Sequence, residues 1–432
     1  MPRMVWIAAL LTAVIATERG DVQAALADRQ TLPAADHPFT YYVSYSSVLA
    51  GSDRAELVAA SRLMIASTSR QIVLERSAPV PVTETLARID LRDLRWDAEA
   101  WLRLVKRYPY ADPSIGPPLV VRADWLTVQL ADANESPAYY ELLLGTAPKT
   151  RDEWLAALNV DKDADPLLRF GLIEEDSGVA RSKVRWLESF PTLNGYAWGT
   201  RDSVEITPEN DPLEHPDGQF KHDGEEWIVG VPKLSLTTRD RGVLQVYLLS
   251  NGQGQRVDKA PVDLVEDSSR FRSNAEIRNP GSCIQCHGEG LNEPSENGLE
   301  DFVLKGAQLF ANGRDKLAEI EAFHLGRISL DRDNEGFGRI VVALTGMDGE
   351  QAASAFRRSV ERFDDPLELS DVARELGVAP EAARNAIANQ TAKGRNLSAR
   401  VVGLAHGRTI TREAFEERYH ELRSYCDEWE AR

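Results

Sequence analysis

Residues 242–258, GVLQVYLLSNGQGQRVD, indicate the fold most clearly, because they combine a strand-like run with a turn. The run 242–250 is rich in the aliphatic and aromatic side chains that favour β-strands. The next four residues, NGQG, suit the loop of a β-hairpin, and QRVD follows as the returning strand. Residues 184–265 as a whole share this pattern of strands and turns, so we expect a β-rich segment there.

Helical patterns lie upstream of this segment. Residues 52–70 begin with a Ser52 or Asp53 cap and carry apolar side chains at helical spacing. Residues 85–91, TLARIDL, alternate loosely, as a strand would. Further helices are predicted for the stretches DAEAWLRLVKR, ADWLTVQLAD, SPAYYELLLG and TRDEWLAAL, with Gly145 ending the third and Thr150 capping the fourth.

Downstream of Gly288 the pattern is almost wholly helical, in short segments separated by turn-forming residues. We therefore expect an α+β fold, with a mixed N-terminal domain at 25–270 that contains the β-rich segment, and a mainly α-helical region at 271–432. The first of these holds seven of the nine tryptophans, which marks one large core.

Composition places the chain among globular proteins. It has 432 residues, of which 43% are hydrophobic and 27% charged, enough for about two or three domains with cores of their own. The formal net charge of −18 argues against nucleic acid or anionic membranes as partners, and is compatible with a basic partner protein. Residues 369–388 resemble a helix-turn-helix, but Arg384 is the lone cation of the candidate recognition helix, so two packed structural helices are the better interpretation.

The N-terminus has the pattern of a secretory signal peptide. Arg3 precedes an apolar run at 5–16 that is too short to cross a bilayer. The small residues around Ala24 predict cleavage after it, with Ala16 as the second choice; the alternatives are an uncleaved anchor or a buried helix. We expect a periplasmic or secreted protein whose mature chain has no transmembrane segment.

Residues 279–290, NPGSCIQCHGEG, contain two cysteines three positions apart and a histidine directly after the second. This is the attachment signature of c-type haem, in which Cys283 and Cys286 would bind the vinyl groups and His287 would be the proximal ligand of the iron. Haem of this kind is attached outside the cytoplasm, so the signature agrees with the predicted export. We expect one covalently bound haem c per chain.

Two other chemistries use closely spaced cysteines. A zinc site would need a fourth ligand, but the sequence has no second C-x-x-C pair and no H-x-x-x-H pair. A redox dithiol would favour a thioredoxin-like βαβ setting, which the sequence around the motif lacks. The third cysteine, Cys426, is left without a cysteine partner, so we do not expect a disulfide framework.

Six blocks of the sequence carry a family resemblance. They are DHPFTYYVS (36–44), RIDLRDLRWDAEAWLRL (88–104), VVRADW (120–125), FKHDGEEWIVGVP (220–232), QVYLLSNGQGQRVDKAP (245–261) and NPGSCIQCH (279–287). Together they resemble a family of large bacterial exported proteins with a c-type cytochrome signature behind a long N-terminal domain. The resemblance implies one haem c per chain and extracytoplasmic electron transfer, and it names no substrate. We expect a redox partner protein and a mainly helical, cytochrome c-like region at 271–432.

The sequence leaves several candidates for the sixth ligand of the iron. Met347 follows the motif at a distance that a helical domain could span, and its thioether would raise the reduction potential. His222, in the KHDGEE turn, could reach the iron if the β-rich segment folded over the haem. His324 and an open or water-bound position are the other choices. A closed site would favour a single-electron carrier, whereas an open one would favour a haem peroxidase-like oxidoreductase or a haem-based sensor or binding module.

Overall fold

The computed structural model describes most of the chain. The described residues are 20–48, 51–111, 116–173, 184–192, 195–205, 207–211, 214–215, 220–260, 271–273, 276–292, 313–323, 330–395 and 397–431. They combine many helices with three β-sheets, so the predicted α+β class is confirmed. Within these residues, no helix has both the length and the apolar character needed to cross a membrane.

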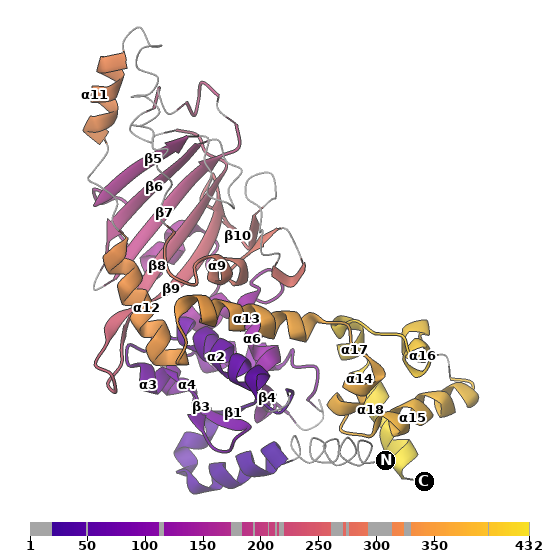
Figure 1. The fold of residues 1–432 in the computed structure, drawn as a ribbon. Helices are drawn as coiled ribbons and strands as arrows, with labels where there is room; N and C mark the ends of the chain where they lie inside the picture. The colour runs from indigo at the N-terminus through magenta and orange to yellow at the C-terminus, as the bar shows by residue number, and fades with distance from the viewer. Residues whose placement is uncertain are drawn as a thin grey trace.

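A six-stranded sheet forms the upper part of the molecule in Figure 1. It consists of β5 (Leu168–Ile173), β6 (Val184–Pro191), β7 (Tyr196–Ser203), β8 (Gly224–Leu234), β9 (Arg241–Asn251) and β10 (Arg256–Val257). The spatial order is β10-β9-β8-β7-β6-β5, and all neighbours are antiparallel. The predicted hairpin loop joins β9 to β10, with the Asn251 N–H donating to the Gln255 carbonyl at 2.9 Å.

A smaller four-stranded sheet lies below the first, with the order β2 (Val80–Pro81), β3 (Leu86–Asp90), β1 (Thr40–Ser44) and β4 (Val120–Arg122). The strand predicted in TLARIDL is β3. The helices around these sheets are η1 (Ala34–Phe39), α2 (Ser52–Ser67), α3 (Leu74–Ser77), α4 (Leu91–Leu94), α5 (Ala98–Val105), α6 (Ala123–Ala131), α7 (Ala138–Leu144) and α8 (Arg151–Ala157).

The five upstream helices predicted from the sequence are therefore observed, as α2 and α5 to α8. The Thr150 side chain caps α8 by accepting from the Glu153 N–H, as expected. The cap predicted at Ser52 or Asp53 is wrong, because Gly51 holds the N-cap position of α2 and no side chain caps that helix.

The large sheet has two different faces, because successive residues of a strand point to opposite sides. Trp227 and Val229 pack on one face with the residues of α7 and α8. Ile228 and Tyr247 lie on the other face, in the core shared with α2. The same alternation sends Glu225 to the first face and Glu226 to the second.

The two cysteines of the C-x-x-C-H motif lie in the short helix α9 (Gly281–Cys286), and His287 caps it. This helix follows η2 (Phe271–Ser273) and the two-stranded ribbon of β11 (Lys259–Ala260) and β12 (Ile277–Arg278). Three longer helices follow, α11 (Gly313–Phe323), α12 (Asp331–Thr345) and α13 (Gly349–Asp364). Both α12 and α13 pack on α2, and α12 also packs on β9.

One continuous core consequently includes residues from Val43 to Phe363, Cys283 among them. The predicted domain boundary at residue 270 does not coincide with a division between cores. The boundary between the two cores comes about 95 residues later in the chain, after α13. The reason is that the apolar faces of α12 and α13 pack against the N-terminal half.

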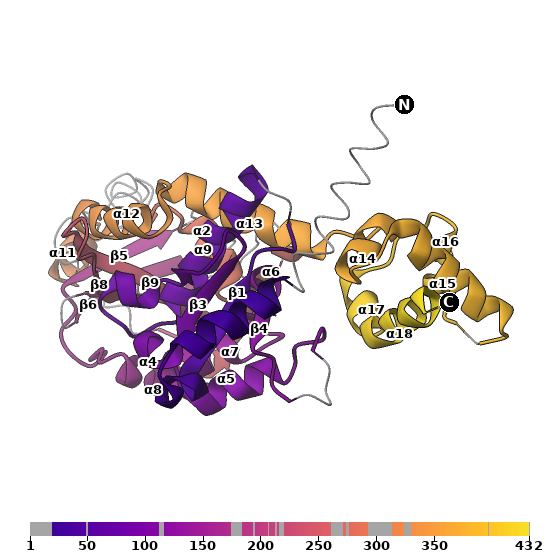
Figure 2. The same ribbon diagram turned by 90° about the horizontal axis from the view of Figure 1, so that it is seen from below.

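The last five helices form a second unit with a core of its own. They are α14 (Leu369–Glu375), α15 (Pro380–Ala392), α16 (Ala399–Ala405), α17 (Arg412–Glu416) and α18 (Tyr419–Glu430). Figures 1 and 2 show this C-terminal unit beside the main body, at the end of α13. Cys426 is buried inside it, and burial raises the pKa of its thiol to about 11.

Candidate haem-attachment site

The turn that carries the motif is short and tightly packed. The His287 N–H donates to the Cys283 carbonyl at 2.8 Å, so the two cysteines occupy one helical turn and His287 ends it. A Cβ added at Gly281 would lie 2.2 Å from the Phe271 ring, and one added at Gly288 would lie 2.4 Å from Ala353 in α13. Glycine at both positions lets the turn fit between η2 and α13.

Asn279 ties this turn to the large sheet. Its side-chain Nδ2 donates to the Tyr140 hydroxyl at 2.7 Å and to the Tyr247 carbonyl at 3.2 Å. Its Oδ1 accepts from the Cys283 thiol at 3.6 Å. The Tyr247 N–H donates to the Tyr139 hydroxyl at 2.8 Å, so side chains satisfy the backbone of β9 at this point.

The His287 ring is held from two sides. Its Nδ1 lies 3.0 Å from the Gly290 carbonyl, which can only accept, so Nδ1 carries a proton, and in the neutral ring the lone pair is on Nε2. The Tyr247 ring stacks on the imidazole, with 6.0 Å between ring centroids and 29° between planes. Histidines that ligate metals usually donate their other ring N–H in this way.

The residues of α9 and His287 therefore provide the donor set that a covalent haem c requires. Two thiols share one turn, and the imidazole beside them has its Nε2 3.8 Å from the Glu226 carboxylate. Cys283 is 3% exposed, while Cys286 is half-buried and is the more open of the two. In the described segments, no group of three or more His, Cys, Asp or Glu side chains is placed to hold a metal ion.

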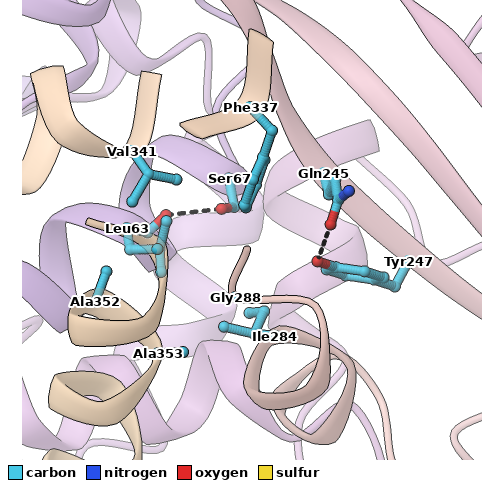
Figure 3. Close-up of a pocket in the computed structure, with 11 residues that line it drawn as sticks. Leu63, Ser67, Gln245, Tyr247, Ile284, Gly288, Phe337, Val341, Ala352 and Ala353 are labelled. Carbon is cyan, nitrogen blue, oxygen red and sulfur yellow. Dashed lines mark hydrogen bonds between the residues drawn. The ribbon is translucent and has the colours of Figure 1, made fainter. Parts of the chain in front are cut away.

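A small cavity borders the motif (Figure 3). It lies between α2, β9, α12, α13 and the turn of Ile284 and Gly288. Its volume is about 10 Å³, room for about one water molecule. The Tyr247 hydroxyl donates to the Gln245 side-chain oxygen at 2.7 Å, and the Gln245 amide donates to the Tyr196 hydroxyl at 2.8 Å. A porphyrin does not fit this cavity.

His222 is held on the opposite face of the sheet from His287. Its Nε2 lies 2.8 Å from Glu225 Oε1, and its Nδ1 lies 3.3 Å from the Phe220 carbonyl. Burial alone would raise the pKa of Glu225, but the His222 hydrogen bond and the charge of Arg151 lower it to about 2. The structure does not bring His222 towards His287, because Glu225 and Glu226 point to opposite faces of β8.

Met347 lies in the turn between α12 and α13, half-buried against the main core. Its N–H donates to the Thr345 hydroxyl at 3.1 Å, a contact that stabilises the turn. Packing of this kind is the common role of a lone methionine. His324 lies outside the described residues.

Glu226 is a residue of the site that sequence reasoning missed. Its Oε1 lies 3.8 Å from His287 Nε2. The stretch GEEWIV could have indicated that Glu226 shares a face with Ile228. Nothing in the sequence indicated that α9 would lie over that face.

Comparisons of the chain with models of protein families, with curated proteins and with solved structures found no match. The resemblance carried by the six sequence blocks therefore stays a prediction.

Proposed function

We propose that this protein is a c-type cytochrome with one covalent haem, and that it transfers single electrons outside the cytoplasm. The observation that carries the proposal is the His287 ring. The Gly290 carbonyl holds its Nδ1–H, which leaves Nε2 as the ligating atom next to two cysteines on one turn. The signature in the sequence supports the same chemistry.

In this proposal Cys283 and Cys286 would hold the haem by thioether bonds, and His287 would be the proximal ligand. The haem would supply a one-electron Fe(III)/Fe(II) couple. The chain's own contribution is to fix the imidazole, through Gly290 and the stacked Tyr247 ring, so that ligand orientation changes little between the two iron states.

A reductive titration of the purified protein tests the carrier function. We expect reversible uptake of one electron per haem and no consumption of hydrogen peroxide. Turnover of peroxide would move the assignment to a haem peroxidase-like oxidoreductase, and tight binding of carbon monoxide by the reduced protein would move it to a sensor. A redox partner protein is expected in either electron-transfer case, and the charge of −18 favours a basic one.

Export is part of the proposal, and the structure favours the second of the two predicted cleavage sites. Residues 20–31 are helical, so a cut after Ala24 would fall inside a helix. It would also remove Asp21, which is buried and accepts from the Ser44 and Thr85 hydroxyls at 2.5 and 2.6 Å. A cut after Ala16 keeps these bonds, and N-terminal sequencing of the exported protein should begin at Thr17.

A further inference from the structure

We propose that the cavity at the junction of the main body and the C-terminal unit binds a free amino acid with an apolar side chain. The cavity lies where α13 ends and the C-terminal unit begins (Figure 1), and residues of α2, α13, α14 and α17 line it. Its volume is about 210 Å³. A cavity of about 150 Å³ already accepts a ligand the size of benzene. None of its lining residues belongs to the candidate haem-attachment site, so this site is independent of the haem proposal.

The cavity wall contains guanidinium N–H groups without an acceptor. The arginines that line it are Arg122, Arg362, Arg374 and Arg412. Arg122 uses all three of its guanidinium nitrogens in bonds to Asp124 and Glu375. Among the described residues, no acceptor meets Arg362 Nη1, Arg374 Nε or Arg412 Nη2. An unpaired buried donor is costly, and a ligand carboxylate would supply the acceptor.

Arg412 is the most firmly held of these three arginines. Its side chain is 8% exposed. Its Nε donates to the Phe363 carbonyl at 3.0 Å, and its Nη1 donates to Glu375 Oε2 at 2.6 Å. The guanidinium is thus fixed before a ligand arrives, which lowers the entropic cost of binding.

Carboxylates of the same wall have oxygens that accept no hydrogen bond. Both arginines that bond Glu375 use its Oε2, so Oε1 has no donor within the described part of the chain. Asp365, in the linker after α13, also lines the cavity, and its carboxylate has no partner among those residues. These two acceptors suit a ligand ammonium group, which has three N–H donors.

The mixed charge of the wall favours a zwitterion over an ion of one sign. Four arginines and five carboxylates line the cavity, so a ligand with a single charge would meet repulsive groups that its own charge does not balance. An α-amino acid carries a carboxylate and an ammonium group side by side, and it can engage both sets of unused atoms. Leu57, Phe363 and Leu367 add apolar surface to the wall, which favours an aliphatic side chain on the ligand.

Calorimetric titration of the full-length protein with L-leucine tests this site. We expect leucine to bind and to raise the melting temperature, because it joins the two units. Isocaproate lacks only the ammonium group of leucine, and isoamylamine lacks only the carboxylate. Each should therefore bind about tenfold to a hundredfold more weakly than leucine.

Two substitutions test whether leucine binds in this cavity. Arg374→Gln removes one guanidinium of the wall and should weaken leucine binding about tenfold or more. Asp365→Asn changes an exposed linker residue and should weaken leucine binding more than isocaproate binding. Arg384→Gln and Glu361→Gln are the matched controls, on exposed side chains outside the cavity wall, and should bind leucine as wild type does. The melting temperature of each variant without ligand verifies that it is folded.

The contrary results are equally clear. A wild-type protein that shows neither heat of binding nor a higher melting temperature with leucine would overturn the proposal. Isocaproate that binds as tightly as leucine would overturn the amino-acid assignment in favour of a plain carboxylate site. Unchanged leucine binding in both folded Arg374→Gln and Asp365→Asn proteins would place the ligand elsewhere. The haem proposal stands or falls separately, on the mass of the protein.

Discussion

Asn279 is the residue that joins the candidate haem turn to the sheet. It is fully buried, and its amide bonds Tyr140, the Tyr247 carbonyl and the Cys283 thiol. An amide is suited to this place because it both donates and accepts. The ring that stacks on His287 belongs to Tyr247, so Asn279 connects the turn of Cys283 with the residue that stacks on His287.

Asn279→Ala should lower the free energy of unfolding by about 2–4 kcal/mol, because it leaves the Tyr247 carbonyl buried without this donor and opens a cavity. Urea unfolding of the purified protein measures the change. Asn134→Ala, on an exposed side chain, is the control and should stay within about 0.5 kcal/mol of wild type. Equal stability of the two variants would contradict the role given to Asn279.

Sequence reasoning could single out Cys283, Cys286 and His287 as candidates, because the spacing of a covalent attachment signature is local. It could not identify Glu226 or Tyr247. Their roles depend on which face of the sheet α9 covers, and that is decided by packing between segments far apart in the chain.

At the scale of elements, Lys233 links β8 to the end of α2. Its buried Nζ donates to the Ser69 and Gln71 carbonyls at 2.7 and 2.9 Å. Both carbonyls belong to the segment just after α2, which ends at Ser67, and a cation near the C-terminus of a helix is favourable. Burial nevertheless lowers the pKa of Lys233 from 10.5 to about 7, and the nearby Arg95 adds to this effect.

This pKa predicts how stability depends on pH. Between pH 7 and 10.5 the unfolded chain binds a proton at Lys233 that the folded chain has released, so the free energy of unfolding should rise with pH. The contribution of one such group is at most about 1.4 kcal/mol per pH unit. Below pH 7 both states hold the proton, and this contribution levels off.

Urea unfolding between about pH 7 and about pH 9 tests this dependence. Lys233→Met should flatten the rise, whatever its effect on stability at a single pH. Lys221→Met, on an exposed lysine, should keep the wild-type slope. A Lys233→Met slope equal to that of wild type would show that Lys233 stays charged in the folded protein.

Elements with local signals were predictable. Thr150 at the start of α8 and the NGQG loop before β10 both act within a few residues of themselves. The length of β8 was not predictable from local signals. The strand includes Glu225, Glu226 and Lys233, which are residue types that disfavour strands, and its pairing with β7 and β9 keeps them in the strand.

At the scale of the whole molecule, a buried ionic cluster joins the C-terminal unit to the main body. Glu375 of α14 accepts from Arg122 of the main body and from Arg412 of α17, each at 2.6 Å. Asp124 pairs with Arg122 at 2.6 Å. Burial would raise the pKa of Glu375, but Arg122 and Arg412 lower it, so the carboxylate stays charged.

Glu375→Gln should destabilise this junction by about 3–5 kcal/mol, because it leaves two buried arginines with too little negative charge. We expect an earlier thermal transition and faster proteolytic release of the C-terminal unit. Glu381→Gln, which alters an exposed pair with Arg384 in the same unit, should change stability by less than about 1 kcal/mol. Indistinguishable melting of the two variants would contradict the junction's importance.

The division into a main body and a C-terminal unit was not predictable from local patterns. Residues 271–364 read as the start of a helical region, but Phe356 and Ile340 pack in the core that begins at Val43. Helical periodicity shows which face of a helix is apolar, but it does not show which distant segment of the chain packs against that face.

The most direct measurement is the mass of the protein after acid extraction of loosely bound haem. The protein made in a host with extracytoplasmic haem maturation should keep its colour and a mass increase of one haem, located on the peptide with Cys283 and Cys286. The double variant Cys283→Ala, Cys286→Ala should lose both. Colour that is fully extractable, or zinc in place of iron, would contradict covalent haem attachment.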